Sequence, residues 1–391
     1  MKAVKIKENV YWVGAIDWNL RNFHGYLTQR GSTYNSYLII DEKITLIDNV
    51  KSYMFEEQLE RIQSVIDPGK IDIIIQNHIE MDHSGSLPLI LKYCPKAEIY
   101  ATAKGAEGLN RHFKQDWAIN VVKGGMTLSL GKRELAFVPT PMVHWPDNMV
   151  SYSAYDKILF SNDAFGQHIA SQERFDHDYS LGILAEEAAK YYANIVLPYG
   201  AQVVKALNAV SGLDIEWILP SHGLIWHERI NEILAMYDNW ANNRTAKKAL
   251  IIYDSMWGST EMMAKMIRNT FSESGVTAEF HNLQGTHISD LMTTILDARY
   301  ICLGSPTLNN NILPTMAAFL TYLQGLAPKG RIGLAFGSYG WGGQSVPILD
   351  KALDEMKFER LSPIKLKFIP DASELTAASE QLKKEIVKYT E

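Results

Sequence analysis

The sequence predicts an α/β protein with two domains, a sandwich of mixed strands followed by a doubly wound parallel sheet. Its 391 residues are enough for two ordinary domains, and 47% of them are apolar, which allows two sizeable cores. The polar stretch 242–248 separates an irregular pattern from a regular alternation of strands and helices and is the expected linker. We therefore expect one domain at residues 1–246 and a second at residues 247–391.

In the first half, short strands are interrupted by a few helices. Apolar runs predict strands at 10–13, 37–40, 45–47, 71–75, 98–101, 135–139 and 157–160. Helical periodicity predicts helices at 53–65, 185–192 and 201–209. This mixture favours two sheets packed face to face and covered by helices.

The second half alternates regularly between the two kinds of element. Strands are predicted at 249–253, 278–281, 300–304, 332–336 and 366–369. Helices are predicted at 260–270, 288–298, 314–323, 346–356 and 374–389. This alternation of strand and helix predicts a parallel sheet with helices on both faces.

The composition excludes several classes of protein. The net charge is −6 and no basic stripe is visible, so we expect no nucleic-acid partner. No run of about 18 apolar residues is present, and residues 1–8 lack the apolar core of a signal peptide. The two cysteines, Cys94 and Cys302, exclude a disulfide framework and a four-cysteine iron site, and we expect both to be buried. These features predict a cytoplasmic protein without a membrane anchor.

The most informative stretch of the first half is 78–83, which directly follows the strand predicted at 71–75. It offers His78, Glu80, Asp82 and His83 as potential metal ligands on a loop at the end of a buried strand. Alternate residues of an extended segment point the same way, so the first three of these can face one cavity. His83 joins them where the chain turns. So many ligands in one loop can serve two cations.

Three further candidates, His144, Asp163 and His222, each follow an apolar run, where an active-site loop belongs. With the first four they make up four imidazoles and three carboxylates, and a pair of metals needs roughly six to eight ligands plus a bridging group. The set lacks a thiolate, which disfavours a structural zinc site. Such nitrogen and oxygen ligands suit redox iron or manganese as well as hydrolytic zinc, so the residues alone leave the metal open.

Three loops of the second half predict a site for a phosphorylated cofactor with a flat ring. The loop 255–260 carries hydroxyl and N–H groups to a helix N-terminus, which suits a phosphate. The loops 304–311 and 337–343 follow the third and fourth strands, and all three loops converge at the topological switch point of a doubly wound sheet. The predicted cofactor-binding residues are Ser255, Met256, Trp257, Gly258, Ser259, Thr260, Ser305, Pro306, Thr307, Asn309, Asn310, Ser338, Tyr339, Gly340 and Trp341, of which Tyr339 or Trp341 can stack on the ring.

Both sets of residues resemble those of the flavodiiron proteins (A-type flavoproteins), the family of the rubredoxin:oxygen oxidoreductases and related nitric oxide reductases. The resemblance is carried by segments 24–26, 33–35, 78–88, 144–147, 161–168, 191–195, 221–223, 255–257 and 304–307. It covers nearly the whole chain, with two unrelated signatures in the family's order. It implies a metallo-β-lactamase-like αββα sandwich followed by a flavodoxin-like doubly wound parallel sheet that binds FMN.

The family also implies a role for each candidate ligand. One iron is held by His78, Glu80 and His144, the other is held by Asp82, His83 and His222, and Asp163 bridges the two. Hydrolytic relatives place a histidine where Glu80 stands, and a carboxylate there fits redox iron. We expect His24 and Tyr192 to be catalytic residues that line the gas pocket and donate a hydrogen bond to substrate, and His168 either to orient a ligand or to lie on the surface.

The function implied by the resemblance is reduction of O2 to water by four electrons, or of NO to N2O by two, at a diiron site supplied by FMN. The C-terminal rubredoxin module of some relatives is not recognised in this sequence, so the resemblance implies an external donor, either rubredoxin or a reduced deazaflavin. A head-to-tail homodimer, or a dimer of such dimers, is expected to bring the FMN of one subunit to the iron of the other. Two alternatives are a binuclear zinc hydrolase with an appended flavin domain and a pure electron carrier whose first half is structural.

Overall fold

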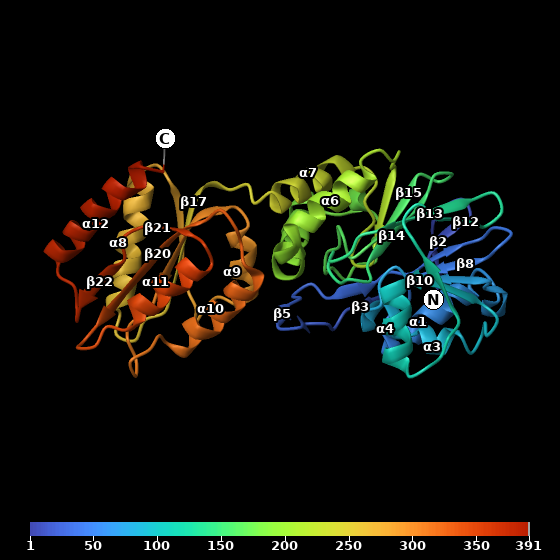
Figure 1. The fold of residues 1–391 in the computed structure, drawn as a ribbon, viewed down its shortest axis with the longest axis horizontal. Coiled ribbons are helices and arrows are strands. Elements are labelled where there is room, and N and C mark those ends of the chain that lie inside the picture. The colour runs from blue at the N-terminus through green and yellow to red at the C-terminus, as the bar shows by residue number, and fades with distance from the viewer. Residues whose placement is uncertain (390–391) are drawn as a thin grey trace. The chain divides into compact units, whose positions relative to one another are not determined.

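The computed structural model describes residues 1–389, and their contacts divide the chain into two compact units (Figure 1). The first unit joins Met1–Tyr191 to Tyr199–Ala241, and the second joins Tyr192–Pro198 to the chain from Asn242 onward. The domain boundary expected after residue 246 remains a prediction. Among the described residues, no helix has both the length and the apolarity needed to cross a membrane.

The first unit contains two sheets. The larger has the order β1-β2-β7-β8-β9-β10-β11, with strands Val4–Lys7, Val10–Trp12, Tyr37–Ile39, Thr45–Ile47, Ile73–Ile75, Glu98–Thr102 and Ile119–Val122. The smaller has the order β12-β13-β14-β15-β16, with strands Thr127–Ser129, Glu134–Pro139, Met149–Ser153, Ile158–Asn162 and Trp217–Pro220. Two short pairs complete the unit, β3 (Ala15–Asp17) with β6 (Ser32–Tyr34) and β4 (Asn22–Phe23) with β5 (Tyr26–Leu27).

The strand β9 separates two hydrophobic cores. Its side chains alternate between faces, so Ile73 and Ile75 enter one core while Ile74 enters the other. The first core also contains Phe137 and Phe160 of the smaller sheet and therefore lies between the sheets. The second core lies against the helices α1, α3 and α4, at Phe55–Gln63, Leu87–Ile90 and Ala103–Phe113. Because the strand is buried on both faces, its sequence is an unbroken apolar run.

Three longer helices, α5, α6 and α7, follow in the first unit at Leu181–Tyr191, Gly200–Val210 and Ile230–Ala241. The two helices α6 and α7 lie beside β14 and β15 (Figure 1). The unit is therefore the αββα sandwich expected from the sequence. The sequence analysis missed α7 and also α4, whose Gly105 and Gly108 lower its helix propensity. A Cβ at Gly108 would lie 2.1 Å from Cδ1 of Ile79, so this glycine allows α4 to approach the segment that carries the first ligands.

The second unit is a parallel sheet covered by helices. Its order is β18-β17-β19-β20-β21, and β22 also pairs with β20. The strands are β17 Ala246–Tyr253, β18 Thr277–Asn282, β19 Ala298–Gly304, β20 Ile332–Tyr339, β21 Glu359–Arg360 and β22 Ile364–Lys367. The helices are α8 Ser259–Glu273, α9 Ile288–Ile295, α10 Pro314–Leu326, α11 Ser345–Glu355 and α12 Ala372–Val387. The first strand lies between the second and the third, so the topological switch point falls between β17 and β19.

Two local expectations are wrong. Residues 242–248 are not a linker throughout, because β17 already begins at Ala246 and its backbone pairs there with β19. The strand predicted at 366–369 is β22, which ends at Lys367. Phe368 has a φ of 55° and leaves the strand, because a residue in the left-handed region cannot continue an extended ladder.

The segment Tyr192–Pro198 precedes α6 in the sequence but packs within the second unit. The side chain of Asn194 donates a hydrogen bond to the carbonyl of Ser289, with 3.1 Å between nitrogen and oxygen. It accepts another from the hydroxyl of Tyr322, at 2.8 Å. This segment is therefore anchored to helices of the flavodoxin-like half.

Candidate metal and flavin sites

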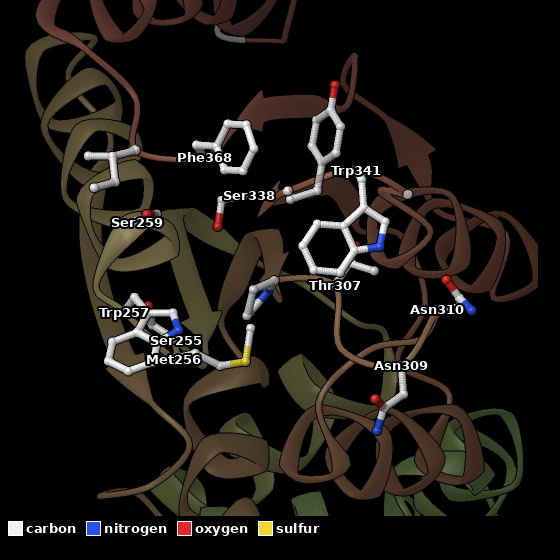
Figure 2. A pocket seen from close by; sticks show the side chains of 15 residues that line it. Ser255, Met256, Trp257, Ser259, Thr307, Asn309, Asn310, Ser338, Trp341 and Phe368 are labelled. Carbon is white, nitrogen blue, oxygen red and sulfur yellow. The ribbon is translucent and has the colours of Figure 1, made fainter.

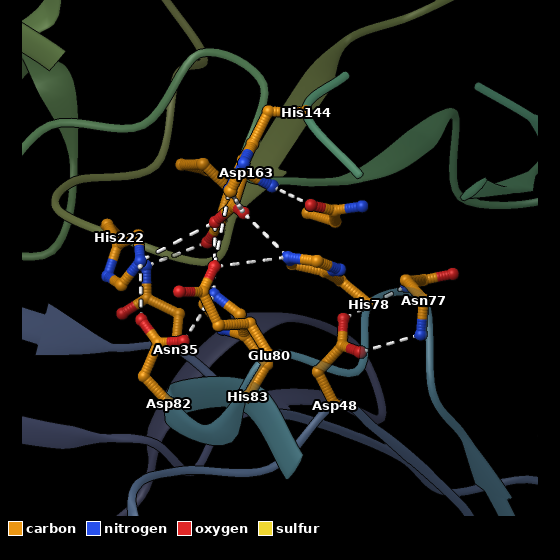
Figure 3. Close-up of polar contacts among 12 residues, drawn as sticks. Asn35, Asp48, Asn77, His78, Glu80, Asp82, His83, His144, Asp163 and His222 are labelled. Carbon is orange, nitrogen blue, oxygen red and sulfur yellow. Dashed lines mark hydrogen bonds and ion pairs between the residues drawn. The ribbon is translucent and has the colours of Figure 1, made fainter. Parts of the chain in front are cut away.

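The seven candidate metal ligands lie in loops that follow strands of the two sheets (Figure 3). The loop after β9 carries His78, Glu80, Asp82 and His83. The loops after β13, β15 and β16 carry His144, Asp163 and His222. In the smaller sheet, β15 is parallel to β16, and β13 runs in the same direction because it is two antiparallel pairings away. Their three loops therefore leave from the same edge of that sheet.

The loop after β9 is not extended throughout, contrary to the sequence prediction. A short helix, α2 (Met81–Ser84), begins directly after Glu80, so Asp82 and His83 project from a helical turn. The Gln76 side chain donates hydrogen bonds to the carbonyls of His78 and His83, at 2.7 and 2.6 Å. This amide ties the two ends of the ligand loop together. Asp82 therefore does not alternate with His78 and Glu80 along an extended segment, as expected from the sequence, but its side chain still reaches the site.

Four of the ligands form a first cluster, in which His78, Glu80, His144 and Asp163 each offer one atom within 4.8 Å of the others. Nε2 of His144 lies 3.1 Å from Oδ2 of Asp163 and 3.4 Å from Oε2 of Glu80. Nε2 of His78 lies 3.4 Å from the same Asp163 oxygen. Two imidazole nitrogens and two carboxylates thus converge on one point.

Asp82, His83 and His222 form a second cluster on the other side of Asp163. Nε2 of His222 lies 3.2 Å from Oδ2 of Asp82, and Nε2 of His83 lies 3.4 Å from Oδ1 of Asp82. Oδ1 of Asp163 lies 3.0 Å from Nε2 of His83 and 3.5 Å from Nε2 of His222. Asp163 therefore faces the first cluster with one oxygen and the second cluster with the other (Figure 3).

The polar atoms of this site are buried without hydrogen-bond partners among the described residues. They are Nε2 of His78, Nε2 of His83, and both carboxylate oxygens of Asp82 and of Asp163. Burying unpaired polar atoms costs several kcal/mol, and a bound cation removes that cost. The donors are all nitrogen and oxygen, which fits two divalent transition ions.

The charge state of Asp163 also suits a ligand. Burial alone would raise the pKa of its carboxyl group. The positive charge of His83 and the neighbouring imidazoles of His144 and His78 outweigh burial and hold that pKa well below its usual range. A metal ligand must be deprotonated, and this carboxyl group is ionised at neutral pH.

Two of the histidines are oriented by groups outside the predicted site. Nδ1 of His78 lies 2.9 Å from Oδ2 of Asp147, which also accepts the backbone N–H of Ile79 at 2.9 Å. Nδ1 of His222 lies 2.7 Å from the carbonyl of Thr33. Both contacts turn Nε2 toward the cluster. The sequence analysis did not select Asp147, because the pairing of residues 69 positions apart has no local signal.

His24 lies at the tip of the hairpin formed by β4 and β5, with a φ of 54°. Its side chain is 72% exposed, and Nε2 lies 2.9 Å from Oε1 of Glu80. The structure thus brings this predicted catalytic residue to the exposed side of the first cluster.

His168 is buried, so the surface alternative is wrong for it. Its Nδ1 lies 2.7 Å from the Ser32 hydroxyl, and its ring lies 4.7 Å from that of His222. The sequence analysis missed Tyr191, whose ring is 5.8 Å from the ring of His222. Tyr192 belongs to the second unit, and its role at the gas pocket remains a prediction.

A cavity of about 630 Å³ lies at the switch point of the second unit (Figure 2). All the predicted cofactor-binding residues line it except Gly258, Thr260 and Ser305. Gly342, Phe368 and Ile369 also line it and were missed. Phe368 and Ile369 had been assigned to a strand, but the turn after β22 directs them to the cavity.

The walls of this cavity match the parts of a flavin nucleotide. Trp257 and Trp341 are 91% and 90% exposed and offer flat faces for a ring (Figure 2). The helix α8 begins at Ser259, directly after Gly258 with a φ of 85°, so its first N–H groups are available to a phosphate. The volume falls within the range of roughly 300–1,000 Å³ that is usual for ligand sites.

Comparisons with known proteins agree with this architecture. Residues 33–223 match the ODP family beta lactamase model, and residues 251–381 match the flavodoxin model. A nitric oxide reductase of Moorella thermoacetica is 43% identical over 92% of this chain and 92% of its own length.

Two solved structures are also similar over almost the full length. The rubredoxin oxygen:oxidoreductase of Desulfovibrio gigas has a TM-score of 0.95 and 43% identity, covering 97% of this chain and 96% of that chain. The flavodiiron protein of Giardia intestinalis has a TM-score of 0.95 and 35% identity, covering 98% of this chain and 96% of that chain. The chain therefore belongs to the flavodiiron protein family.

Proposed function

We propose that this protein is an oxidoreductase that reduces O2 to water, NO to N2O, or both, at a diiron centre supplied with electrons by FMN. The observation that carries the proposal is the position of Asp163, which turns one oxygen to each of two buried ligand clusters. The flavin-sized cavity at the switch point of the second unit provides the second cofactor site. The names of the relatives, an oxygen oxidoreductase and a nitric oxide reductase, agree with this activity.

In this proposal each cluster holds one iron and Asp163 bridges the pair. The first iron is assigned to His78, Glu80 and His144, and the second to Asp82, His83 and His222. When bound, the two irons and the flavin supply the electrons for reduction of the gas. The protein fixes the ligand set, because the contacts of Nδ1 of His78 and of His222 hold each ring in one orientation.

His24 is proposed to contact the substrate on the exposed side of the first cluster. His24 is exposed and its Nε2 lies 2.9 Å from Oε1 of Glu80, so its ring is placed to donate an N–H to a substrate that reaches the first cluster. Tyr192 is proposed for the same task. Both side chains are proposed to donate a hydrogen bond to the substrate, as the family resemblance implies.

The flavin is proposed to bind in the cavity of the second unit. Its phosphate is assigned to the N-terminus of α8 and to the hydroxyls of Ser255 and Ser259. Its ring is assigned to the rim formed by Trp257 and Trp341. Neutral polar side chains at Thr307, Asn309 and Asn310 line the remaining wall and can bind ring heteroatoms.

Three organisational features belong to the same proposal. The domains are assigned to 1–246 and 247–391, and the two family matches fall on either side of that boundary. The protein is proposed to act in the cytoplasm with an external donor, rubredoxin or a reduced deazaflavin. A head-to-tail homodimer is proposed to bring FMN and iron together, and a monomer with full turnover would contradict it.

The two alternatives receive less support. A zinc hydrolase does not account for relatives named as reductases of O2 and NO. A pure electron carrier would leave the buried polar atoms of Asp82 and Asp163 without a purpose. Reduction of gas at a diiron site accounts both for the names of the relatives and for the buried polar atoms.

The test is anaerobic reduction of protein loaded with FMN and iron, followed by separate pulses of O2 and NO. We expect consumption of at least one gas, with two irons and one FMN per chain. Asp163→Asn should lose most of the iron and the gas consumption while it retains FMN. Asp116→Asn changes an exposed aspartate and serves as the control. Retained gas consumption in Asp163→Asn would contradict the assignment of the site, and zinc with hydrolytic activity in the wild type would favour the hydrolase.

A further inference from the structure

A second, much smaller cavity lies in the first unit behind the metal-binding loops. Its volume is about 20 Å³. It is bounded by β14, β15, α6, α7 and the loops after β13 and β15. The lining residues used below are Val143, Ala164, Phe165, Ala206, Leu207 and Tyr237.

The cavity shares its wall with the metal site. Val143 directly precedes His144, and Ala164 directly follows Asp163. Nε2 of His144 and Oδ2 of Asp163 lie 3.1 Å apart in the first cluster. A molecule in the cavity is therefore separated from the first cluster by the backbone of two ligand-bearing loops.

The lining offers little to a water molecule. It contains no charged side chain, its two hydroxyl-bearing residues are Thr140 and Tyr237, and the Tyr237 hydroxyl accepts the backbone N–H of Phe165 at 2.7 Å. An internal water usually makes about three hydrogen bonds, whereas apolar cavities stay dry and take up xenon or small apolar molecules. The cavity is thus suited to an uncharged gas.

The size of the cavity restricts its occupant further. A space of roughly 10–15 Å³ on this measure holds one water-sized molecule. At about 20 Å³ the cavity has room for one diatomic molecule and excludes an acyl chain or an aromatic ring. Ala164, Ala206 and Leu207 are partly exposed while Val143, Phe165 and Tyr237 are buried, so the wall beside α6 is the part of the cavity nearest to solvent.

We propose that this cavity is a staging site for the gaseous substrate, which enters beside α6 and waits behind His144 and Asp163. The role of the cavity in supplying substrate rests on the proposed function, whereas its affinity for an apolar gas rests only on its lining and size. The cavity raises the local concentration of O2 or NO next to the first cluster. It takes no part in the chemical step.

Xenon is the probe for the site. Crystals of the loaded protein and of metal-free protein are pressurised with xenon, and the anomalous density is measured. We expect one xenon peak in the cavity in both. Leu207→Ala, which enlarges the cavity, should raise xenon occupancy. Ala206→Leu, which fills it, should abolish the peak.

Kinetics then tests the staging role. Ala206→Leu should raise the KM for O2 or NO by a factor on the order of 3–10, with kcat, iron content and FMN content unchanged. The matched control is Ala209→Leu, which adds the same volume at an exposed position of the same helix. It should keep both the xenon peak and the wild-type KM.

The outcomes separate this proposal from the proposed function. Wild-type turnover without a xenon peak overturns the staging site alone. Loss of xenon in Ala206→Leu with an unchanged KM also overturns it. If Ala206→Leu fails to fold, Leu207→Ala becomes the deciding variant. Unchanged xenon occupancy in Leu207→Ala would contradict the proposal. A xenon peak in protein that consumes neither gas refutes the proposed function. The cavity would then bind apolar gas but would have no role in supplying substrate.

Discussion

Nδ1 of His78 lies 2.9 Å from Oδ2 of Asp147, and the two residues come from different sheets of the sandwich. The same carboxylate oxygen accepts the backbone N–H of Ile79. The imidazole therefore cannot rotate without losing its contact with a fixed partner. The Asp147 carboxylate therefore fixes the orientation of the His78 ring, a candidate ligand of the first cluster.

Removal of that carboxylate should weaken iron binding. Partners of this kind typically change metal affinity by about 10–100-fold, so Asp147→Ala is expected to lower iron affinity by a factor in that range. The measurement is competition with a chelator, followed by iron analysis. Asp116→Ala, at an exposed position, should match the wild type. Equal iron affinity in Asp147→Ala and the control would show that His78 needs no such partner.

Replacement of Glu80 should change the metal. Glu80→His exchanges a carboxylate for an imidazole in the first cluster, which should favour zinc over ferrous iron because divalent zinc binds imidazole more strongly. Metal analysis of protein reconstituted in an equal mixture of the two ions should give a higher zinc-to-iron ratio than the wild type. Glu107→His places the same change on an exposed side chain and should leave the ratio unaltered. An unchanged ratio in Glu80→His would mean that Glu80 does not select the metal.

Truncation of Trp341 should weaken flavin binding. An aromatic stacking contact contributes up to about 1.4 kcal/mol, which corresponds to a Kd for FMN that is about tenfold higher in Trp341→Ala. The quenching of FMN fluorescence on binding measures this Kd. Trp18→Ala removes a half-exposed tryptophan of the first unit and is the control. If both variants bind FMN equally well, Trp341 does not stack on the ring.

Glu187 should make stability depend on pH. Burial raises its pKa from 4.5 to about 7, although Lys190 and Arg30 oppose the shift. The folded state therefore binds a proton that the unfolded state releases near pH 4.5. The resulting stabilisation is fully present below that pH and is lost as the pH rises through about 7.

Glu187→Gln should remove this dependence. Between pH 5 and pH 8 the wild type is expected to lose about 2–3 kcal/mol of unfolding free energy relative to the variant. Urea unfolding followed by tryptophan fluorescence at the two pH values gives the difference. Glu186→Gln alters the neighbouring, 60% exposed carboxylate and should behave like the wild type. Parallel pH profiles for wild type and Glu187→Gln would contradict the assignment.

The features that the sequence could predict are those with local signals. Strands such as β17 and β19 are apolar runs bounded by glycine or polar residues, and a parallel sheet follows from their alternation with helices. The seven candidate ligands could be selected because each segment that carries them follows such a run, and the fold brings them together in two clusters. The loops of the flavin cavity were found for the same reason.

The features that the sequence could not predict depend on distant partners or on strained backbone. Asp147 contacts His78 only because the two sheets pack together. Helix α4 contains Gly105 and Gly108, which lower its helix propensity and hid its periodicity, and a Cβ at Gly108 would lie 2.1 Å from Cδ1 of Ile79. Phe368 reaches the flavin cavity through a left-handed residue that no apolar pattern reveals.

The anchoring of Asn194 by Ser289 and Tyr322 has a practical consequence for anyone who wishes to cut the protein in two. A fragment that ends near residue 246 would carry the segment Tyr192–Pro198 away from the helices that hold it. The remaining fragment would expose the surface that the segment covers. Separate expression of the halves would therefore give two damaged pieces, and the intact polypeptide is the smallest object in which either cofactor site should be studied.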